Sequence, residues 1–175
     1  MVTSVPLRDG RSIPAIGFGV YKVDDAEAET AVGLALDAGY RHVDTAEMYG
    51  NETGVGKAIR ASRLDHDDVF VTTKVWNDHQ GRDATLRAFD ASLDRLGLDA
   101  VDLYLIHWPA AANDRYVETW RALVELRRSG SQLRIARGSS TPRPAITAPT
   151  VKPPTGPLPS IRKPAIAEPP AAPIS

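Results

Sequence analysis

The 175-residue sequence contains no cysteine, and this absence excludes disulfide cross-links, zinc–thiolate sites and thiol nucleophiles. It also lacks any apolar run that approaches the roughly 20 residues needed for a membrane-spanning helix. Residues 1–10 have neither the basic start nor the long apolar stretch of a secretory signal. We therefore expect a cytoplasmic protein that does not associate with a membrane. Since no array of basic and aromatic residues stands out, we expect no nucleic-acid partner.

Charge, aromatic residues and proline are distributed unevenly along the chain. Residues 1–130 carry 15 Lys and Arg against 21 Asp and Glu, whereas residues 131–175 carry 6 against 1. All eleven aromatic residues lie at or before Trp120, and eleven of the fourteen prolines lie at or after Pro142. Because proline interrupts helices and central strands, residues 131–175 predict a disordered, proline-rich tail behind a folded region that ends near residue 130. A ligand for a proline-recognising module is the less favoured interpretation of this tail.

Apolar runs and helical patterns alternate four times in the first 130 residues, which favours a parallel α/β fold. An Asp9-Gly10 turn signal between two short extended runs predicts an N-terminal hairpin. Strand-like runs follow at residues 15–21, 42–44, 69–74 and 101–107, and helical patterns begin near residues 24, 53, 83 and 116. Asp24 and Glu27 have the spacing of a capping box, and Gly97 predicts a helix end. Four such units fit a small open sheet or half of an eight-unit barrel.

Polar side chains stand at or just past the ends of three predicted strands. Asp44, Lys74 and His107 occupy these positions, and Tyr49 follows Asp44 closely. Because the carboxyl ends of parallel strands open onto one mouth, these side chains could share a pocket. A phenol titrates at about pH 10, but a nearby ammonium favours the phenolate and a carboxylate can hold that ammonium in place. With an imidazole to orient the substrate oxygen, this set suits protonation of a carbonyl oxygen while hydride reaches its carbon.

Each of these residues also has an ordinary structural interpretation. A strand-end Asp is often a cap, a loop Tyr usually packs, and a strand-end Lys commonly reaches solvent. The two glycines of the run at 15–21 fit close strand packing as well as close approach of a ligand. We interpret His42 as a packing residue, with a metal site formed with Asp44 and His107 as the weaker alternative, and His79 as a solvated loop residue. Only the joint occurrence of the four polar residues favours catalysis.

Over about residues 3–130 the sequence resembles the aldo-keto reductases. The matching stretches stand in the family's order and spacing at residues 17–21, 39–46, 48–52, 73–76, 105–109 and 118–120. A short linker after Pro109 is similar to the prokaryotic, diketogluconate-reductase-like branch. The resemblance implies the N-terminal half of a (β/α)8 TIM barrel with an N-terminal β-hairpin that closes its base. It also implies NADPH-dependent reduction of small aldehydes and ketones to alcohols.

The resemblance further implies roles for individual residues. Four residues would be catalytic: Asp44, Tyr49, Lys74 and His107. Four would bind the cofactor: Gly19, Val20, Tyr21 and Asp44. Three would line the substrate pocket: Trp76, His107 and Trp108. In these roles Tyr49 is the general acid, Lys74 tunes it, Asp44 pairs with Lys74, and His107 orients the carbonyl, without any metal ligand.

The resemblance stops near Gly130, where family members continue into a fifth strand and three further β/α units. A half barrel would leave its first and fourth strands as open edges and would lack the wall opposite the catalytic set. We therefore expect weak NADPH binding and weak or no activity from the chain as written. The alternative is a noncatalytic fragment, truncated or frameshifted near residue 130, that associates with itself or with another chain. Full-length members of the family are usually monomeric.

Overall fold

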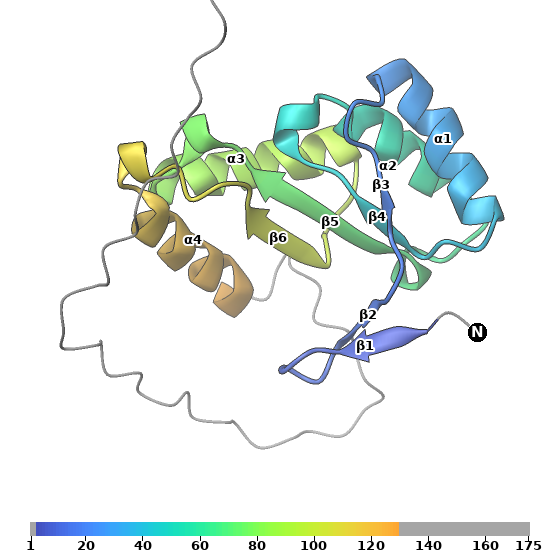
Figure 1. Cartoon of the computed structure of the whole chain (residues 1–175), viewed down its shortest axis with the longest axis horizontal. Coiled ribbons are helices and arrows are strands. Elements are labelled where there is room, and N and C mark those ends of the chain that lie inside the picture. The colour runs from blue at the N-terminus through green and yellow to red at the C-terminus, as the bar shows by residue number, and fades with distance from the viewer. Residues whose placement is uncertain (1–2, 130–175) are drawn as a thin grey trace, which may run out of the picture. The chain divides into compact units, whose positions relative to one another are not determined.

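The computed structural model describes residues 3–129, which belong to one compact unit, and Figure 1 shows their arrangement. A two-stranded antiparallel hairpin precedes a four-stranded parallel sheet with helices packed against it. This architecture confirms the predicted alternation of strands and helices. The expected proline-rich tail, 131–175, lies outside the described residues.

The elements follow the predicted order. The hairpin consists of β1 (Ser4–Pro6) and β2 (Ser12–Pro14). The parallel sheet has the order β3 (Phe18–Gly19), β4 (His42–Asp44), β5 (Phe70–Val75) and β6 (Leu103–Ile106). The α-helices are α1 (Asp25–Asp37), α2 (Glu52–Ala61), α3 (Arg82–Leu96) and α4 (Tyr116–Ser129). Short 3₁₀ turns, which the sequence did not predict, are η1 (Glu47–Tyr49), η2 (His66–Asp68), η3 (Asn77–His79) and η4 (Ala111–Asn113).

Two helix boundaries show how far local signals carry. Gly97 ends α3 with φ of 61°, a left-handed conformation that glycine adopts without a Cβ penalty, as predicted. The capping box predicted at Asp24 and Glu27 is wrong, because the Asp24 side chain makes no capping hydrogen bond. Instead the neighbouring Asp25 carboxylate accepts the Gly54 N–H at 2.7 Å and ties α1 to α2. A Cβ at Gly54 would clash with the Asp25 carbonyl oxygen, so glycine permits this close approach.

The hydrophobic core lies on the face of the sheet that the helices cover. Val43, Val71 and Val75 are fully buried there, and Phe89 of α3 packs on Tyr104 of β6 with ring centroids 4.8 Å apart. Because side chains alternate along a strand, the intervening residues point to the opposite face. That alternation separates the packing residues of β4 and β5 from the polar residues that form the candidate site.

The hairpin braces the amino-terminal end of β6, away from the carboxyl ends of the strands. Arg11 Nη1 donates to the Asp102 carbonyl oxygen at 2.8 Å, and Asp9 pairs with Arg127 of α4 at 3.4 Å. Within residues 3–129, β3 and β6 are the edge strands of the parallel sheet, as expected for a half barrel.

Candidate active site

An ion pair joins the carboxyl ends of β4 and β5. Lys74 Nζ donates to Asp44 Oδ1 at 2.5 Å and to the Thr45 carbonyl oxygen at 3.0 Å. Asp44 and Lys74 point to the same face because Asp44 is in register with Thr72, two residues before Lys74. The Lys74 side chain is only 13% exposed, so solvent screens this pair less than a surface pair. The two contacts fix the ammonium at the mouth of the sheet.

Tyr49 is brought to the same ammonium by a short turn. It is the last residue of η1, and Gly50 closes this turn in the left-handed region with φ of 68°. Lys74 Nζ lies 3.4 Å from Tyr49 Oη and 5.1 Å from the centre of the phenol ring. The structure therefore places the acid, the amine and the phenol in one contact chain, in the order Asp44, Lys74, Tyr49.

His107 follows β6 directly and completes the cluster. Its backbone N–H donates to the Val75 carbonyl oxygen at 3.2 Å. Its ring meets Tyr49 edge to face at a centroid distance of 5.5 Å, and Trp76 in the same way at 5.2 Å. Burial, together with the positive charge of Lys74, lowers the pKa of His107, although the Asp44 carboxylate acts in the opposite direction. The neutral imidazole is therefore favoured at neutral pH.

The segment after β3 forms a second side of the site. Val20 is fully buried and its N–H donates to the Asp44 carbonyl oxygen at 3.1 Å. Tyr21 is 58% exposed, with its ring 5.1 Å from that of Tyr49. A Cβ at Gly19 would meet no atom within 4 Å, whereas one at Gly17 would lie 2.6 Å from the His42 ring. Gly17 thus serves strand packing, and Gly19 leaves open space beside Asp44.

A buried asparagine, whose role no sequence pattern indicates, ties these two sides together. Asn51 Oδ1 accepts the Thr45 hydroxyl at 2.8 Å, while Asn51 Nδ2 donates to the Val20 and Val23 carbonyl oxygens at 2.9 and 2.7 Å. Asn51 is fully buried. The segment that carries Tyr21 is therefore fixed to the turn that carries Tyr49.

A buried glutamate beneath the site was also missed. Glu52 is 1% exposed; it accepts the Thr73 hydroxyl at 2.6 Å and pairs with Arg95 of α3 at 2.7 Å. Thr73 is the strand neighbour of Lys74, so this contact supports β5 from the helix side. The stretch 48–52 matches the family pattern, but only three-dimensional pairing shows what its last two residues bind.

Glu47 was missed for the same reason. Its Oε2 accepts the Trp76 backbone N–H at 2.9 Å, and its Oε1 lies 2.5 Å from His79 Nδ1. His79 is an exposed loop residue, as predicted, and its half-exposed ring also has a carboxylate partner. Trp108, the other expected pocket wall, is 58% exposed and its ring stacks on His107 at 6.1 Å.

His42 has a packing role, and the metal alternative has no support in the described residues. Its Nε2 lies 3.0 Å from Thr72 Oγ1, its ring meets Phe70 edge to face, and burial lowers its pKa. Residues 3–129 contain no group of three or more His, Asp or Glu side chains that could hold a metal ion. Across the same residues, none of the helices combines the length and apolarity that crossing a membrane requires.

Comparison with known proteins shows to which family this chain belongs. The sequence profile of the Aldo/keto reductase family matches residues 15–142, which is most of the chain. The chain belongs to the aldo/keto reductase family. The named resemblance is thereby confirmed, and with it the fold, since solved structures of the family superimpose on this chain.

Three relatives illustrate the match. An aldo/keto reductase structure from Brucella melitensis is 54% identical with a TM-score of 0.73, covering 75% of this chain and 52% of that chain. The structure of a Gox0644 mutant in complex with NADPH is 48% identical with a TM-score of 0.69, covering 74% and 46%. The methylglyoxal reductase DkgA of Yersinia pestis is 49% identical over 126 residues, which are 72% of this chain and 45% of DkgA.

These aldo/keto reductases are (β/α)8 barrels, and the present chain corresponds to the N-terminal half of one. The chain spans about half the length of the curated relatives that it matches. Members of the family are oxidoreductases, and several relatives of this chain are named as reductases.

Proposed function

We propose that this chain carries the proton-transfer centre of an NADPH-dependent carbonyl reductase, with Tyr49 as the general acid. The observation that carries the proposal is the position of Lys74 Nζ, 2.5 Å from Asp44 Oδ1 and 3.4 Å from Tyr49 Oη. An ammonium that donates to a phenol oxygen stabilises the phenolate left behind when the proton departs. Asp44 keeps that ammonium charged and directed toward Tyr49.

The proton follows a short route in this proposal. Tyr49 Oη protonates the oxygen of the substrate carbonyl as hydride reaches the carbonyl carbon, and an alcohol results. The phenolate that remains is held by Lys74 until it recovers a proton from solvent. His107, favoured in its neutral form, donates an N–H to the same carbonyl oxygen and orients it.

The residues beside this centre fit the nicotinamide end of the cofactor. NADPH, when bound, supplies the hydride. The open space over Gly19 lets a flat ring approach the backbone, and the exposed Tyr21 ring offers an aromatic surface next to Tyr49. The backbone hydrogen bond from the Val20 N–H to the Asp44 carbonyl oxygen holds the segment after β3 beside β4. A close structural relative is solved in complex with NADPH, which supports the same cofactor here.

The substrate side favours a small aldehyde or ketone. Trp76, His107 and Trp108 form a run of ring contacts that would line one wall of the substrate pocket. Flat aromatic walls with a single proton donor suit a compact carbonyl compound rather than a charged polymer. A relative named as a methylglyoxal reductase makes methylglyoxal a suitable first substrate.

Substitution of Tyr49 by phenylalanine, which removes only the phenol oxygen, tests the proposal. NADPH oxidation by the 175-residue chain is measured with methylglyoxal, beside Tyr49→Phe and, as a matched control, Tyr116→Phe on the exposed side of α4. The wild-type rate is expected to be low, because much of a family barrel is not represented in this chain. Tyr49→Phe is expected to lose about 100-fold or more of it, the usual contribution of a general acid, while Tyr116→Phe keeps it. A Tyr49→Phe rate equal to wild type would overturn the assignment.

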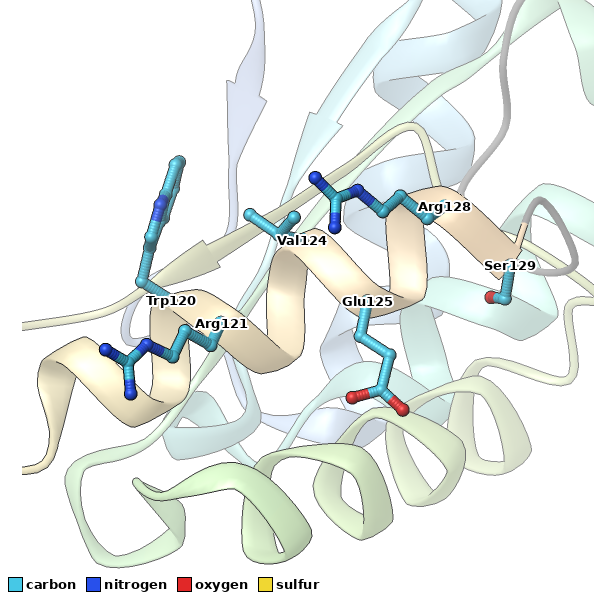
Figure 2. Close-up of a pocket in the computed structure, with 6 residues that line it drawn as sticks. All are labelled: Trp120, Arg121, Val124, Glu125, Arg128 and Ser129. Carbon is cyan, nitrogen blue, oxygen red and sulfur yellow. The ribbon is translucent and has the colours of Figure 1, made fainter. Parts of the chain in front are cut away.

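We further propose that the chain associates with a second copy of itself through β6 and α4. Leu105 of β6 and Trp120 of α4 are 37% and 61% exposed, and both line a cleft of about 290 Å³ beside the edge strand. Figure 2 shows Trp120, Val124 and Arg128 projecting from the same side of α4, while Glu125 points toward α3. An edge strand that has no partner on its outer side within residues 3–129, next to exposed apolar side chains, is a surface that another chain can extend.

A second copy fits this surface by symmetry. A two-fold axis through the middle of the edge pairs β6 with β6 in antiparallel fashion and sets α4 beside α4. Trp120 and Arg128 stand four residues on either side of Val124. An axis that also passes beside Val124 brings each Trp120 opposite Arg128 of the second copy, an arrangement in which a guanidinium covers an indole face. The surface is thus complementary to itself.

Light scattering after gel filtration tests this association over a range of micromolar concentrations. Val124→Arg places two guanidinium groups against each other at the axis and is expected to yield monomers. Leu34→Arg, at an exposed apolar residue of α1, should leave the dimer intact. A wild-type chain that remains monomeric at all concentrations would overturn the proposal.

A further inference from the structure

One carboxylate connects the turn that ends in Tyr49 with the segment that carries Trp76. Glu47 begins η1, two residues before Tyr49, and its Oε2 accepts the Trp76 backbone N–H at 2.9 Å. Its Oε1 lies 2.5 Å from Nδ1 of His79, the last residue of η3. The Glu47 side chain is only 13% exposed, although His79 is about half exposed. The carboxylate is thus a shielded bridge between two segments that no strand pairing joins at this point.

The bridge sets the relative position of three rings. Trp76 meets the His107 ring at 5.2 Å, and His107 meets the Tyr49 ring at 5.5 Å. Glu47 closes this chain of contacts from the other side, because it is covalently linked to Tyr49 through η1 and hydrogen-bonded to the backbone of Trp76. A shift of Trp76 would therefore change the space between the phenol and the pocket wall.

We infer that Glu47 is a positioning residue that sets the width of the substrate pocket between Tyr49 and Trp76. Each carboxylate oxygen has a distinct task in this arrangement. Oε2 fixes the backbone at Trp76, where β5 has just ended and the sheet no longer supplies a partner. Oε1 holds η3 through His79 and prevents the segment from turning outward. The inference rests on the proposed function, since pocket width matters only if Tyr49 and Trp76 act on a common substrate.

Three variants separate the two tasks. Glu47→Ala removes both contacts, Glu47→Gln retains an oxygen that can accept the Trp76 N–H, and His79→Ala removes only the η3 contact. Glu125→Ala serves as a matched control, because it also breaks a glutamate ion pair, with Arg82 on the helix surface. All four are compared with the wild-type 175-residue chain.

Amide hydrogen exchange at Trp76 is the readout that does not depend on activity. Loss of one hydrogen bond to a charged acceptor should speed exchange of this amide about tenfold in Glu47→Ala, with less than about threefold change in Glu47→Gln. Glu125→Ala should leave it unchanged. Exchange at Trp76 that is equally slow in Glu47→Ala and Glu125→Ala would overturn the role of Glu47, whatever the catalytic rates.

Kinetics with two aldehydes supply the second readout. Glu47→Ala should lower kcat/KM for methylglyoxal about tenfold, mainly through KM, while a bulkier aromatic aldehyde is affected less because the pocket becomes wider. Glu47→Gln should recover most of this loss, and His79→Ala should lie between them. An equal loss for both aldehydes would mean general destabilisation and would contradict a positioning role. Absence of NADPH oxidation in every chain, wild type included, would instead overturn the proposed function.

Discussion

The carboxyl ends of β4 and β5 and the outer edge of β6 belong to one sheet but differ in how their side chains are satisfied. At the former, Lys74 binds Asp44 and reaches Tyr49, and Glu52 supports β5 from beneath. At the latter, Leu105 and Trp120 expose apolar surface beside β6, whose outer edge has no partner strand within the described residues. Charged side chains are paired at one place, and apolar burial is incomplete at the other.

This difference separates the residues of the proposed site from those that would close the barrel. Residues 44–52 and 72–76 supply most of the proposed proton-transfer centre and its braces, and they lie at the ends of two adjacent strands and in the segments that follow. Burial of the β6 edge instead needs residues outside the described range or a second chain.

Removal of the Lys74 charge should have the largest effect, and it acts on the site alone. Lys74→Met should lower the rate of NADPH oxidation about 100- to 10,000-fold, because the phenolate of Tyr49 would lose its stabilising ammonium. Lys57→Met, at an exposed residue of α2, should retain the wild-type rate, and the circular dichroism spectra of both variants should match the wild type. A Lys74→Met variant with undiminished activity would contradict the proposed role of Lys74 in proton transfer.

Loss of the buried carboxylate of Glu52 should be the next largest effect. Glu52→Ala leaves the Thr73 hydroxyl and Arg95 without their acceptor and should lower the free energy of unfolding by about 3 kcal/mol in urea titrations. Glu125→Ala, which breaks an exposed pair, should stay within about 0.5 kcal/mol of wild type. Equal destabilisation by the two substitutions would show that the buried contacts of Glu52 stabilise the fold no more than the exposed ion pair of Glu125.

The sequence was sufficient for elements whose signals are local. Alternating apolar runs located the strands, the Asp9-Gly10 pair located the hairpin turn, and Gly97 located the end of α3. The three strand-end residues Asp44, Lys74 and His107 could be expected at one mouth because parallel strands share their direction.

Contacts between distant segments were beyond these signals. Glu47 binds the backbone of Trp76, and Asn51 binds two carbonyl oxygens after β3. Backbone partners leave no trace in the side-chain sequence, so neither contact has a pattern that periodicity could detect. The failed capping box has the same origin, since Asp25 binds α2 while the Asp24 side chain caps nothing. Tertiary partners decided which of two adjacent carboxylates was used.

The cleft beside β6 offers a smaller, pH-dependent effect. Burial raises the pKa of Asp102 from 3.8 to about 6, although the Val71 N–H and Arg11 oppose the shift. Because the folded state holds this proton more tightly than the unfolded state, the wild-type chain loses stability as the pH rises from about 4 through 6. Asp102→Asn should therefore be more stable than wild type by about 1–2 kcal/mol at pH 7.5, and by much less at pH 4.

Unfolding titrations at the two pH values check this sign. Asp99→Asn, at an exposed carboxyl nearby in the sequence, should show no such difference. A stability gain in Asp102→Asn that is equal at both pH values would show that proton uptake by Asp102 is not its cause.

Substitution of Trp120 should have the smallest effect on the stability of the monomer, so it tests whether a second copy buries this side chain. A side chain that is 61% exposed contributes little to burial, so Trp120→Ser should change the free energy of unfolding by no more than about 0.5 kcal/mol in dilute solution. Leu34→Ser, which alters a similarly exposed residue of α1, sets the reference. If Trp120→Ser lowers stability only at concentrations where the wild type is dimeric, the missing burial comes from a second copy. A loss of stability well above that of Leu34→Ser at every concentration would show that Trp120 is buried by a contact within the same chain. Only an intramolecular contact is independent of dilution.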